Sequence, residues 1–237
     1  MAISLIQKYN VAGPRYTSYP TVPYWESDTF STEKWLDSLV TSYNESNANE
    51  GISLYIHLPF CESLCTFCGC HKRITKRHEV EAPYIDAVLK EWQLYTDVLV
   101  ARPLIKEIHL GGGTPTFFKP SELKRLIEGI FERADIAEQH EFSFEGHPNN
   151  TSKAHLQLLY NLGFRRVSYG VQDYSEKVQK AIHRIQPFEN VKRVTDQARE
   201  IGYTSVSHDL VFGLPFQTLD DVLYTIDKSN TLRPDRI

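Results

Sequence analysis

The stretch ISLYIHLPFCESLCTFCGC, residues 52–70, places four cysteines directly after a predicted strand. Residues 52–58 have the apolar, β-branched and aromatic composition of a buried strand. The cysteines follow as Cys61-x-x-x-Cys65-x-x-Cys68-x-Cys70, and the 237-residue chain has no others. A disulfide framework would spread its cysteines along the chain to close long loops. Clustering on one short segment instead predicts an inorganic centre in a reducing cytoplasm.

Beyond the cysteines, strand and helix patterns alternate. Strands are expected at 105–110, 140–145, 165–172 and 205–213, and helices at 82–99, 121–134 with Ser121 as a cap, 153–163, 175–182, 191–202 and 219–230. This alternation predicts βαβ units with a parallel sheet. The closing residues, RPDRI, resemble the start of a sixth strand. We therefore expect an α/β fold, an open and partial TIM-like β/α barrel over residues 51–237 that is truncated at its C-terminus.

Residues 1–50 are expected to form an irregular N-terminal arm with a short helix. The segment GPRYTSYPTVPYW, residues 13–25, is too rich in Pro for a helix and too aromatic for a free linker. The arm either packs over the barrel domain or covers an active site. A helix is predicted at 33–43, with Ser31 or Thr32 as its cap.

Composition excludes several classes of protein. Hydrophobic residues make up 41% and charged residues 24% of the chain, which excludes a disordered or fibrous chain. The net charge is −4, without a basic stripe, so nucleic acid is not an expected partner. No apolar run approaches the roughly 18 residues of a membrane helix. The N-terminus lacks a secretion signal, so the protein is expected in the cytoplasm, without a membrane partner.

The cysteine spacing leaves three possible centres. Structural zinc usually takes pairs of cysteines from separate places. Iron–sulfur clusters are commonly held by closely spaced cysteines of one segment. Redox-active or unliganded thiols are the third possibility. The spacing favours a cluster.

The spacing also resembles the radical S-adenosylmethionine superfamily, whose signature is Cys-x-x-x-Cys-x-aromatic-Cys, with Phe67 as the aromatic residue. The resemblance implies that Cys61, Cys65 and Cys68 bind three irons of a [4Fe–4S] cluster and that Cys70 does not. The fourth iron is then open to S-adenosylmethionine. One-electron reduction in that family cleaves the sulfonium and gives a 5′-deoxyadenosyl radical.

Further polar motifs follow the predicted strands. GGGTPT, residues 111–116, lacks the Lys of a phosphate loop, so it is either a tight turn or a loop that receives a ligand. Singly, each of Glu145, Gln172 and Asp209 is more often solvated or hydrogen-bonded than a ligand, and Arg184 would by default be a solvated helix residue. Together, Glu145, Gln172 and Asp209 fall toward the carboxyl ends of strands, the active-site face of β/α barrels.

A more specific resemblance runs across essentially the whole chain. The chain resembles the first half of the oxygen-independent coproporphyrinogen III oxidase family. The motifs that carry this resemblance are GPRYTSYPT, SLYIHLPFC, CTFCGC, HLGGGTPT, GVQD and LVFGLP. That family holds one cluster and two S-adenosylmethionine molecules. The resemblance assigns Tyr55, Gly112 and Glu145 to the first molecule. It assigns the second molecule to Phe67, Gly113, Thr114, Gln172, Arg184 and Asp209.

The same resemblance implies an oxidoreductase of haem biosynthesis. Its substrate would be coproporphyrinogen III, and it would need a low-potential electron donor. Two alternatives stay open: a haem-binding or haem-delivery protein with the same cluster loop, and a zinc-stabilised binding scaffold. His147 stands where the family often has an acidic residue, which is either lineage variation or an altered contact. With half of the family's length, this chain alone is expected to be inactive or weakly active.

Overall fold

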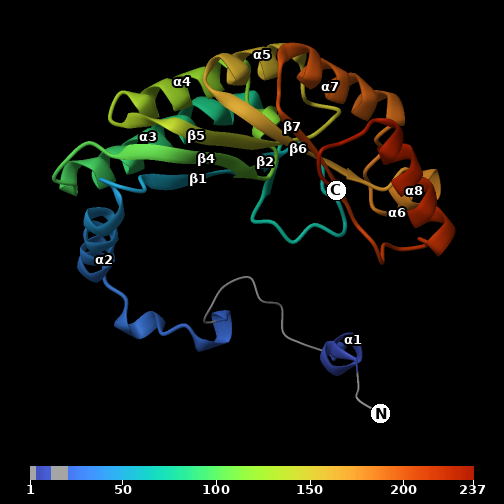
Figure 1. Ribbon diagram of the computed structural model, residues 1–237, viewed down its shortest axis with the longest axis horizontal. Helices are drawn as coiled ribbons and strands as arrows, with labels where there is room; N and C mark the ends of the chain where they lie inside the picture. Colours follow the sequence, from blue (N-terminus) through green and yellow to red (C-terminus); the bar gives the residue numbers. More distant parts are fainter. Residues whose placement is uncertain (1–3, 12–20) are drawn as a thin grey trace. The chain divides into compact units, whose positions relative to one another are not determined.

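Five parallel strands form the central sheet of the computed structural model, which describes residues 4–11 and 21–237 (Figure 1). In sheet order they are β1 (Ile52–Leu58), β4 (Leu104–Gly112), β5 (Asp135–Gly146), β6 (Phe164–Gln172) and β7 (Ser205–Leu210). Within the described residues the sheet does not close into a barrel, and a single parallel bridge from Ser207 to Arg236 begins a further strand. The predicted open α/β half-barrel is confirmed. The motif at residues 13–20 lies outside the described part.

Four helices cover one face of this sheet (Figure 1). They are α3 (Glu81–Val98), α4 (Pro120–Phe131), α5 (Lys153–Asn161) and α7 (Phe188–Ile201). Two more, α6 (Glu176–Ala181) and α8 (Leu219–Thr231), lie side by side, joined by an ion pair of 2.8 Å from Lys177 Nζ to Asp221 Oδ2. Among the described helices, none is long and apolar enough to cross a membrane.

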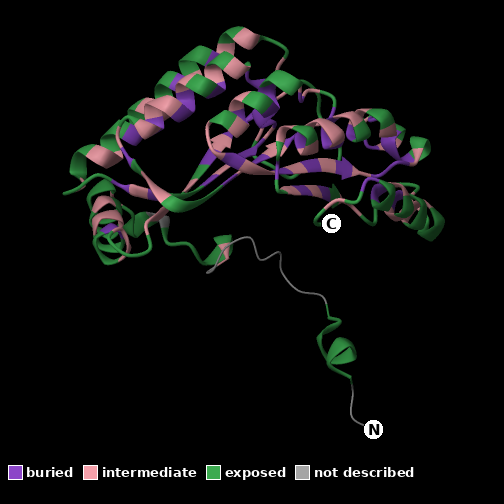
Figure 2. Ribbon diagram, turned by 45° about the horizontal axis from the view of Figure 1, so that its top comes forward, coloured by how far each residue is buried: buried purple, intermediate pink, exposed green. Residues whose placement is uncertain are grey.

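The strands alternate between two faces because successive side chains point to opposite sides of a sheet. Buried residues such as Leu58, Leu110, Phe144 and Val167 pack against the helices and form the purple core of Figure 2. Each fully buried side chain of this size contributes about 1.5–3 kcal/mol through the hydrophobic effect. The other side, which we call the polar face, carries Ser53, Tyr55, His57, Glu107, His109, Glu141, Ser143, Glu145, Arg166, Ser168, Ser205, Ser207 and Asp209.

The chain divides into two compact units, Met1–Thr41 and Ser42–Ile237. The first contains α1 (Leu5–Tyr9) and the short 3-10 helices Val22–Tyr24 and Ser27–Thr29. Helix α2 (Thr32–Ser46) spans the boundary. Its predicted cap is confirmed, since Lys34 N–H donates to Ser31 Oγ at 3.2 Å.

The predicted cap of α4 is wrong. Pro120, not Ser121, opens the helix, and Lys119 is the N-cap residue without a capping side chain. Proline suits the first helical position because its φ is already helical and its missing N–H needs no partner there. The Lys119 N–H donates instead to Glu81 Oε2 at 2.9 Å, which ties α4 to α3.

Candidate functional site

The cysteines lie on a loop that is closed at its base by two short strands. β2 (Phe60–Cys61) pairs in parallel with β3 (Arg73–Ile74). We call residues 61–73 the cysteine loop. Its far side is also fixed, because the Thr66 N–H donates to Ile182 O at 3.1 Å. The loop is therefore tied both to the sheet and to the end of α6.

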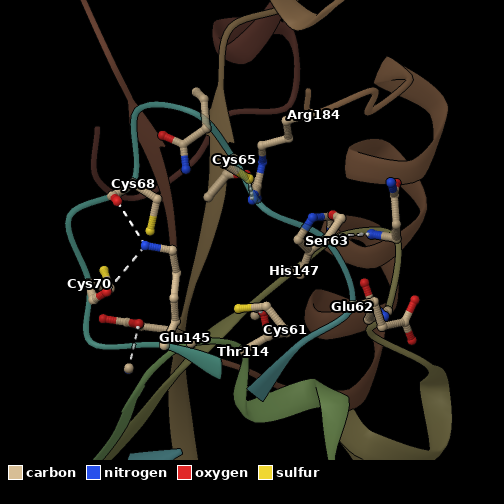
Figure 3. A pocket seen from close by; sticks show the side chains of 18 of the residues that line it. Cys61, Glu62, Ser63, Cys65, Cys68, Cys70, Thr114, Glu145, His147 and Arg184 are labelled. Carbon is tan, nitrogen blue, oxygen red and sulfur yellow. Dashed lines mark hydrogen bonds between the residues drawn. The ribbon is translucent and has the colours of Figure 1, made fainter. Parts of the chain in front are cut away.

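All four thiols are free, and Figure 3 shows them around one cavity. Thr114 Oγ1 lies 3.4 Å from Cys61 Sγ, and Arg184 Nη1 donates to Cys65 Sγ at 3.6 Å. Burial raises the pKa of the Cys61 thiol, and the contact with Thr114 opposes that shift. The Thr114 hydroxyl at the Cys61 sulfur favours the thiolate form of Cys61, which is the form that binds metals.

Lys72 closes the cysteine loop from within. Its Nζ donates to Cys68 O at 2.9 Å and to Cys70 O at 3.3 Å. Both carbonyls therefore have a charged partner, which fixes the turn that carries the last two cysteines. Lys72 belongs to none of the motifs described above, and its place two residues after the last cysteine is the sequence signal that points to it.

Residues 111–116 form what we call the glycine loop. Its three glycines, 111–113, are so closely surrounded that none of them has room for a side chain. A Cβ on Gly113 would lie 2.5 Å from Pro59 O and 3.0 Å from Cys61 Sγ. Gly112 has φ +117°, a conformation that residues with a side chain rarely adopt. The Gly112 N–H donates to Glu145 Oε2 at 3.3 Å. The glycines thus bring Glu145 and the first cysteine to the same wall.

Residues at the ends of β6 and β7 complete the cavity. Gln172 ends β6 with φ +68°, a left-handed conformation that costs about 1–2 kcal/mol outside glycine. Non-glycine residues held in such conformations cluster at functional sites. Asp209 accepts from Ser168 Oγ at 2.6 Å, and its pKa is raised by burial and further by Glu145.

Arg184 does not lie on a helix, so its default interpretation as a solvated helix residue is wrong. The chain leaves α6 and turns at His183, which has φ +55°. This turn directs the guanidinium inward, where Nη2 donates to Gly170 O at 2.5 Å. The Arg184 Nε atom is buried and has no hydrogen-bond partner among the described residues. A ligand acceptor would satisfy it.

A cavity of about 380 Å³ collects nearly all of the predicted site residues. Those lining it are Cys61, Cys65, Phe67, Cys68, Gly112, Gly113, Thr114, Glu145, Gln172, Arg184 and Asp209. Tyr55 does not line the cavity. Its ring stacks on His109 with centroids 5.9 Å apart, and its hydroxyl lies 3.0 Å from His57 Nδ1. We call this space the cofactor cavity.

His147 also lines the cofactor cavity. Its Nδ1 accepts the Asn149 N–H at 3.1 Å, which leaves Nε2 as the protonated nitrogen of the neutral ring. Burial lowers the pKa of His147 to about 3, and the charge of Arg184 adds to the shift. The wall therefore carries a neutral imidazole at this position.

The donor set fits a polynuclear centre. In the described ranges, no group of three or more Cys, His, Asp or Glu side chains could hold one metal ion. A zinc ion needs its ligands at about 2.0–2.3 Å. In an iron–sulfur cluster each thiolate binds a different iron atom, so thiols spread around one cavity fit it.

Comparison with known proteins agrees with this geometry. The family described as the radical SAM superfamily matches residues 55–228, well over half of the chain. The chain belongs to the radical SAM superfamily. Membership implies a [4Fe–4S] cluster and S-adenosylmethionine as cofactors. The predicted family resemblance is confirmed.

Curated relatives of this radical SAM chain carry the name oxygen-independent coproporphyrinogen III oxidase. The Pseudomonas aeruginosa PAO1 relative is 36% identical over 235 residues, which is 98% of this chain and 50% of the relative. The Helicobacter pylori J99 relative is 40% identical over 231 residues, with shares of 97% and 50%. The solved coproporphyrinogen III oxidase of Escherichia coli, described as a radical SAM enzyme, gives a TM-score of 0.85 at 34% identity and covers 93% of this chain and 49% of that one. The chain thus spans about half the length of the curated relatives it matches.

Proposed function

We propose that this chain is the cofactor-binding part of a cytoplasmic, oxygen-independent coproporphyrinogen III oxidase. The observation that carries the proposal is the cofactor cavity, which gathers four free thiols, Gly112 and Gly113 of the glycine loop and the polar strand ends at one place. The oxidase name of the curated relatives favours this function over a haem carrier or a zinc-stabilised scaffold.

The cysteine loop would hold the cluster through Cys61, Cys65 and Cys68. Cys70, the one exposed thiol of the four, would not be a ligand. Held there, the cluster would supply one-electron reduction of the sulfonium of S-adenosylmethionine, and it would need a low-potential electron donor.

Two S-adenosylmethionine molecules would bind beside it. The first would contact Gly112 and Glu145 in the cofactor cavity and would extend to Tyr55, which lies outside the lining of that cavity. The second would contact Phe67, Gly113, Thr114, Gln172, Arg184 and Asp209. The unpartnered Nε of Arg184 and the raised pKa of Asp209 both suit a polar, charged ligand.

The reaction would move one hydrogen atom from a propionate side chain of coproporphyrinogen III to the 5′-deoxyadenosyl group derived from S-adenosylmethionine. Loss of carbon dioxide, with one electron passed to a one-electron acceptor, would then leave a vinyl group. Two such conversions give protoporphyrinogen IX. Because a carbon radical attacks any nearby C–H bond, the chain's own task is to orient the substrate and to exclude water and other hydrogen donors.

Anaerobic reconstitution tests the cofactor part of this proposal. The protein is loaded with iron and sulfide, and its iron, sulfide and zinc contents are measured with the EPR spectrum of the reduced sample. We expect about four irons per chain and a cluster signal. A protein that takes up zinc alone, without an EPR-active cluster, would overturn the assignment.

Single Cys-to-Ser substitutions test the ligand set. Changing Cys61, Cys65 or Cys68 should abolish the cluster, whereas Cys70→Ser is the matched control and should keep it. Equal loss in the Cys70 variant would contradict the assignment. Incubation with coproporphyrinogen III, S-adenosylmethionine and reductant then tests the reaction, read as vinyl products by mass spectrometry. Cofactor cleavage without any vinyl product would favour a carrier.

A further inference from the structure

A second cavity, of about 210 Å³, lies on the polar face of the sheet. We call it the arginine–serine cavity. Two guanidinium groups and four hydroxyls line it, from Arg166, Arg236, Ser143, Ser168, Ser205 and Ser207. The strand register explains the set, because Ser143, Arg166 and Ser205 pair in sequence across β5, β6 and β7.

This cavity has more hydrogen-bond donors than its own residues can use. Arg166 Nη1 forms an ion pair with Glu141, but a guanidinium carries five N–H donors. In the described part of the chain, Arg236 has no ion-pair partner, and the hydroxyls of Ser205 and Ser207 have no hydrogen-bond partner. An anion with two oxygen acceptors matches such a set.

The two arginines also act on each other. Burial lowers the pKa of the Arg166 guanidinium, the positive charge of Arg236 lowers it further, and the carboxylate of Glu107 partly opposes the shift. Like charges at short range destabilise each other unless an anion lies between them. A bound carboxylate would relieve this repulsion, and arginine forks fit carboxylates through two parallel hydrogen bonds.

The lining of this cavity meets the lining of the cofactor cavity at two side-chain pairs. His109 Nε2 lies 3.5 Å from Glu145 Oε1, and Ser168 Oγ donates to Asp209 Oδ1 at 2.6 Å. In each pair the first residue lines the arginine–serine cavity and the second lines the cofactor cavity. One ligand can therefore occupy both spaces, with an acidic arm in one and its reacting group in the other.

We propose that the arginine–serine cavity binds a carboxylate arm of the substrate while a different arm reacts in the cofactor cavity. The inference rests on the proposed function. Coproporphyrinogen III carries four propionates, of which two become vinyl groups. The other two stay anionic through both conversions, so they can hold the macrocycle while it is processed.

Equilibrium dialysis under anaerobic conditions tests the inference. The reconstituted protein is dialysed against coproporphyrinogen III, which is then oxidised and measured by porphyrin fluorescence. Arg236→Gln should raise the Kd about tenfold, the size of one lost charge-assisted hydrogen bond. Arg233→Gln is the matched control: it removes the same charge from an exposed residue that does not line the cavity. The tetramethyl ester of the substrate, which has no carboxylates, should bind both variants and the parent protein alike.

The outcomes separate the two proposals. Unchanged binding by Arg236→Gln, or equal weakening by Arg233→Gln, would overturn the carboxylate site and leave the proposed function standing. Failure of the parent protein to bind coproporphyrinogen III, despite a full cluster, would overturn both. Weakening confined to Arg236→Gln and to the free acid supports the site. Cluster iron content, measured on every sample, ensures that no variant is scored after losing its cofactor.

Discussion

His208 is a buried histidine, and it should make the protein less stable in mild acid. Its side chain is fully buried, Nε2 lies 3.1 Å from Thr195 Oγ1, and Nδ1 has no partner among the described residues. Burial lowers its pKa from 6.5 to about 4, and the charge of Arg199 adds to that shift. Protonation would place a charge with no counter-ion in the core, so the folded state resists it.

The sign and size of the effect follow from proton linkage. The unfolded chain binds a proton at His208 as the pH falls through 6.5, and the folded chain does so only near 4. The contribution to stability is therefore complete above pH 6.5 and is lost on going down toward pH 4. With these two pKa values, the free energy of unfolding falls by about 2 kcal/mol between pH 7.5 and pH 5.

Urea unfolding at pH 7.5 and pH 5 measures this loss. His208→Gln keeps a hydrogen-bonding group for Thr195 but cannot titrate, so its loss between the two pH values should be about 2 kcal/mol smaller than the parent's. Thr195→Val is the matched control, because it removes the hydrogen bond and keeps the titrating ring. This control should be less stable at both pH values and retain the acid sensitivity. If His208→Gln loses as much stability as the parent protein, the reasoning is refuted.

Three further perturbations address the cofactor cavity. Gly113→Ala should cost about 1–3 kcal/mol of stability and much of the cluster iron, because its Cβ would meet backbone. Gly213→Ala has open space around its Cβ but a left-handed backbone at φ +79°, so it should cost about 1 kcal/mol through backbone strain and keep the iron. Lys72→Met should speed iron release to a chelator, and an unchanged release rate would show that its two hydrogen bonds do not hold the loop. Gln172→Gly should raise the free energy of unfolding by about 1 kcal/mol in urea, because glycine adopts the left-handed conformation without strain. The same variant should bind S-adenosylmethionine more weakly in dialysis. Equal binding would show that Gln172 does not contact the cofactor.

The sequence pattern predicted most of the sheet. Burial of one face of a strand makes apolar residues recur at every second position, and this alternation can be read from the sequence. Residues 165–172 alternate in this way, and β6 spans Phe164–Gln172. Strand β5 begins at Asp135, five residues before the predicted start, because its first part is exposed and its register shifts against β4. The two-residue strands at Phe60 and Arg73 have no periodic pattern at all. Their pairing depends on the path of the whole cysteine loop.

The candidate site was predictable where a sequence motif determines the backbone conformation. It was less predictable where the direction of a side chain depends on tertiary contacts. The cysteine spacing and the glycine loop located one wall of the cavity. The direction of the Arg184 side chain depends on the turn at His183, and the orientation of Tyr55 depends on stacking with His109. Arg236 belongs to no motif, and only the bridge to Ser207 brings it to the polar face.

Each strand has a helix-facing side and a polar face. A shift of the strand by one residue would therefore exchange the side chains on the two sides. Inserting one residue ahead of Arg166 would turn every later residue of β6 over. Val167 and Tyr169 would then face the cavities, while Arg166 and Ser168 would face the helices. A conservative substitution changes one contact, but such an insertion exchanges the core and the binding surface of a whole strand. Insertions should therefore be tolerated in the surface loops between elements and rejected inside the five strands.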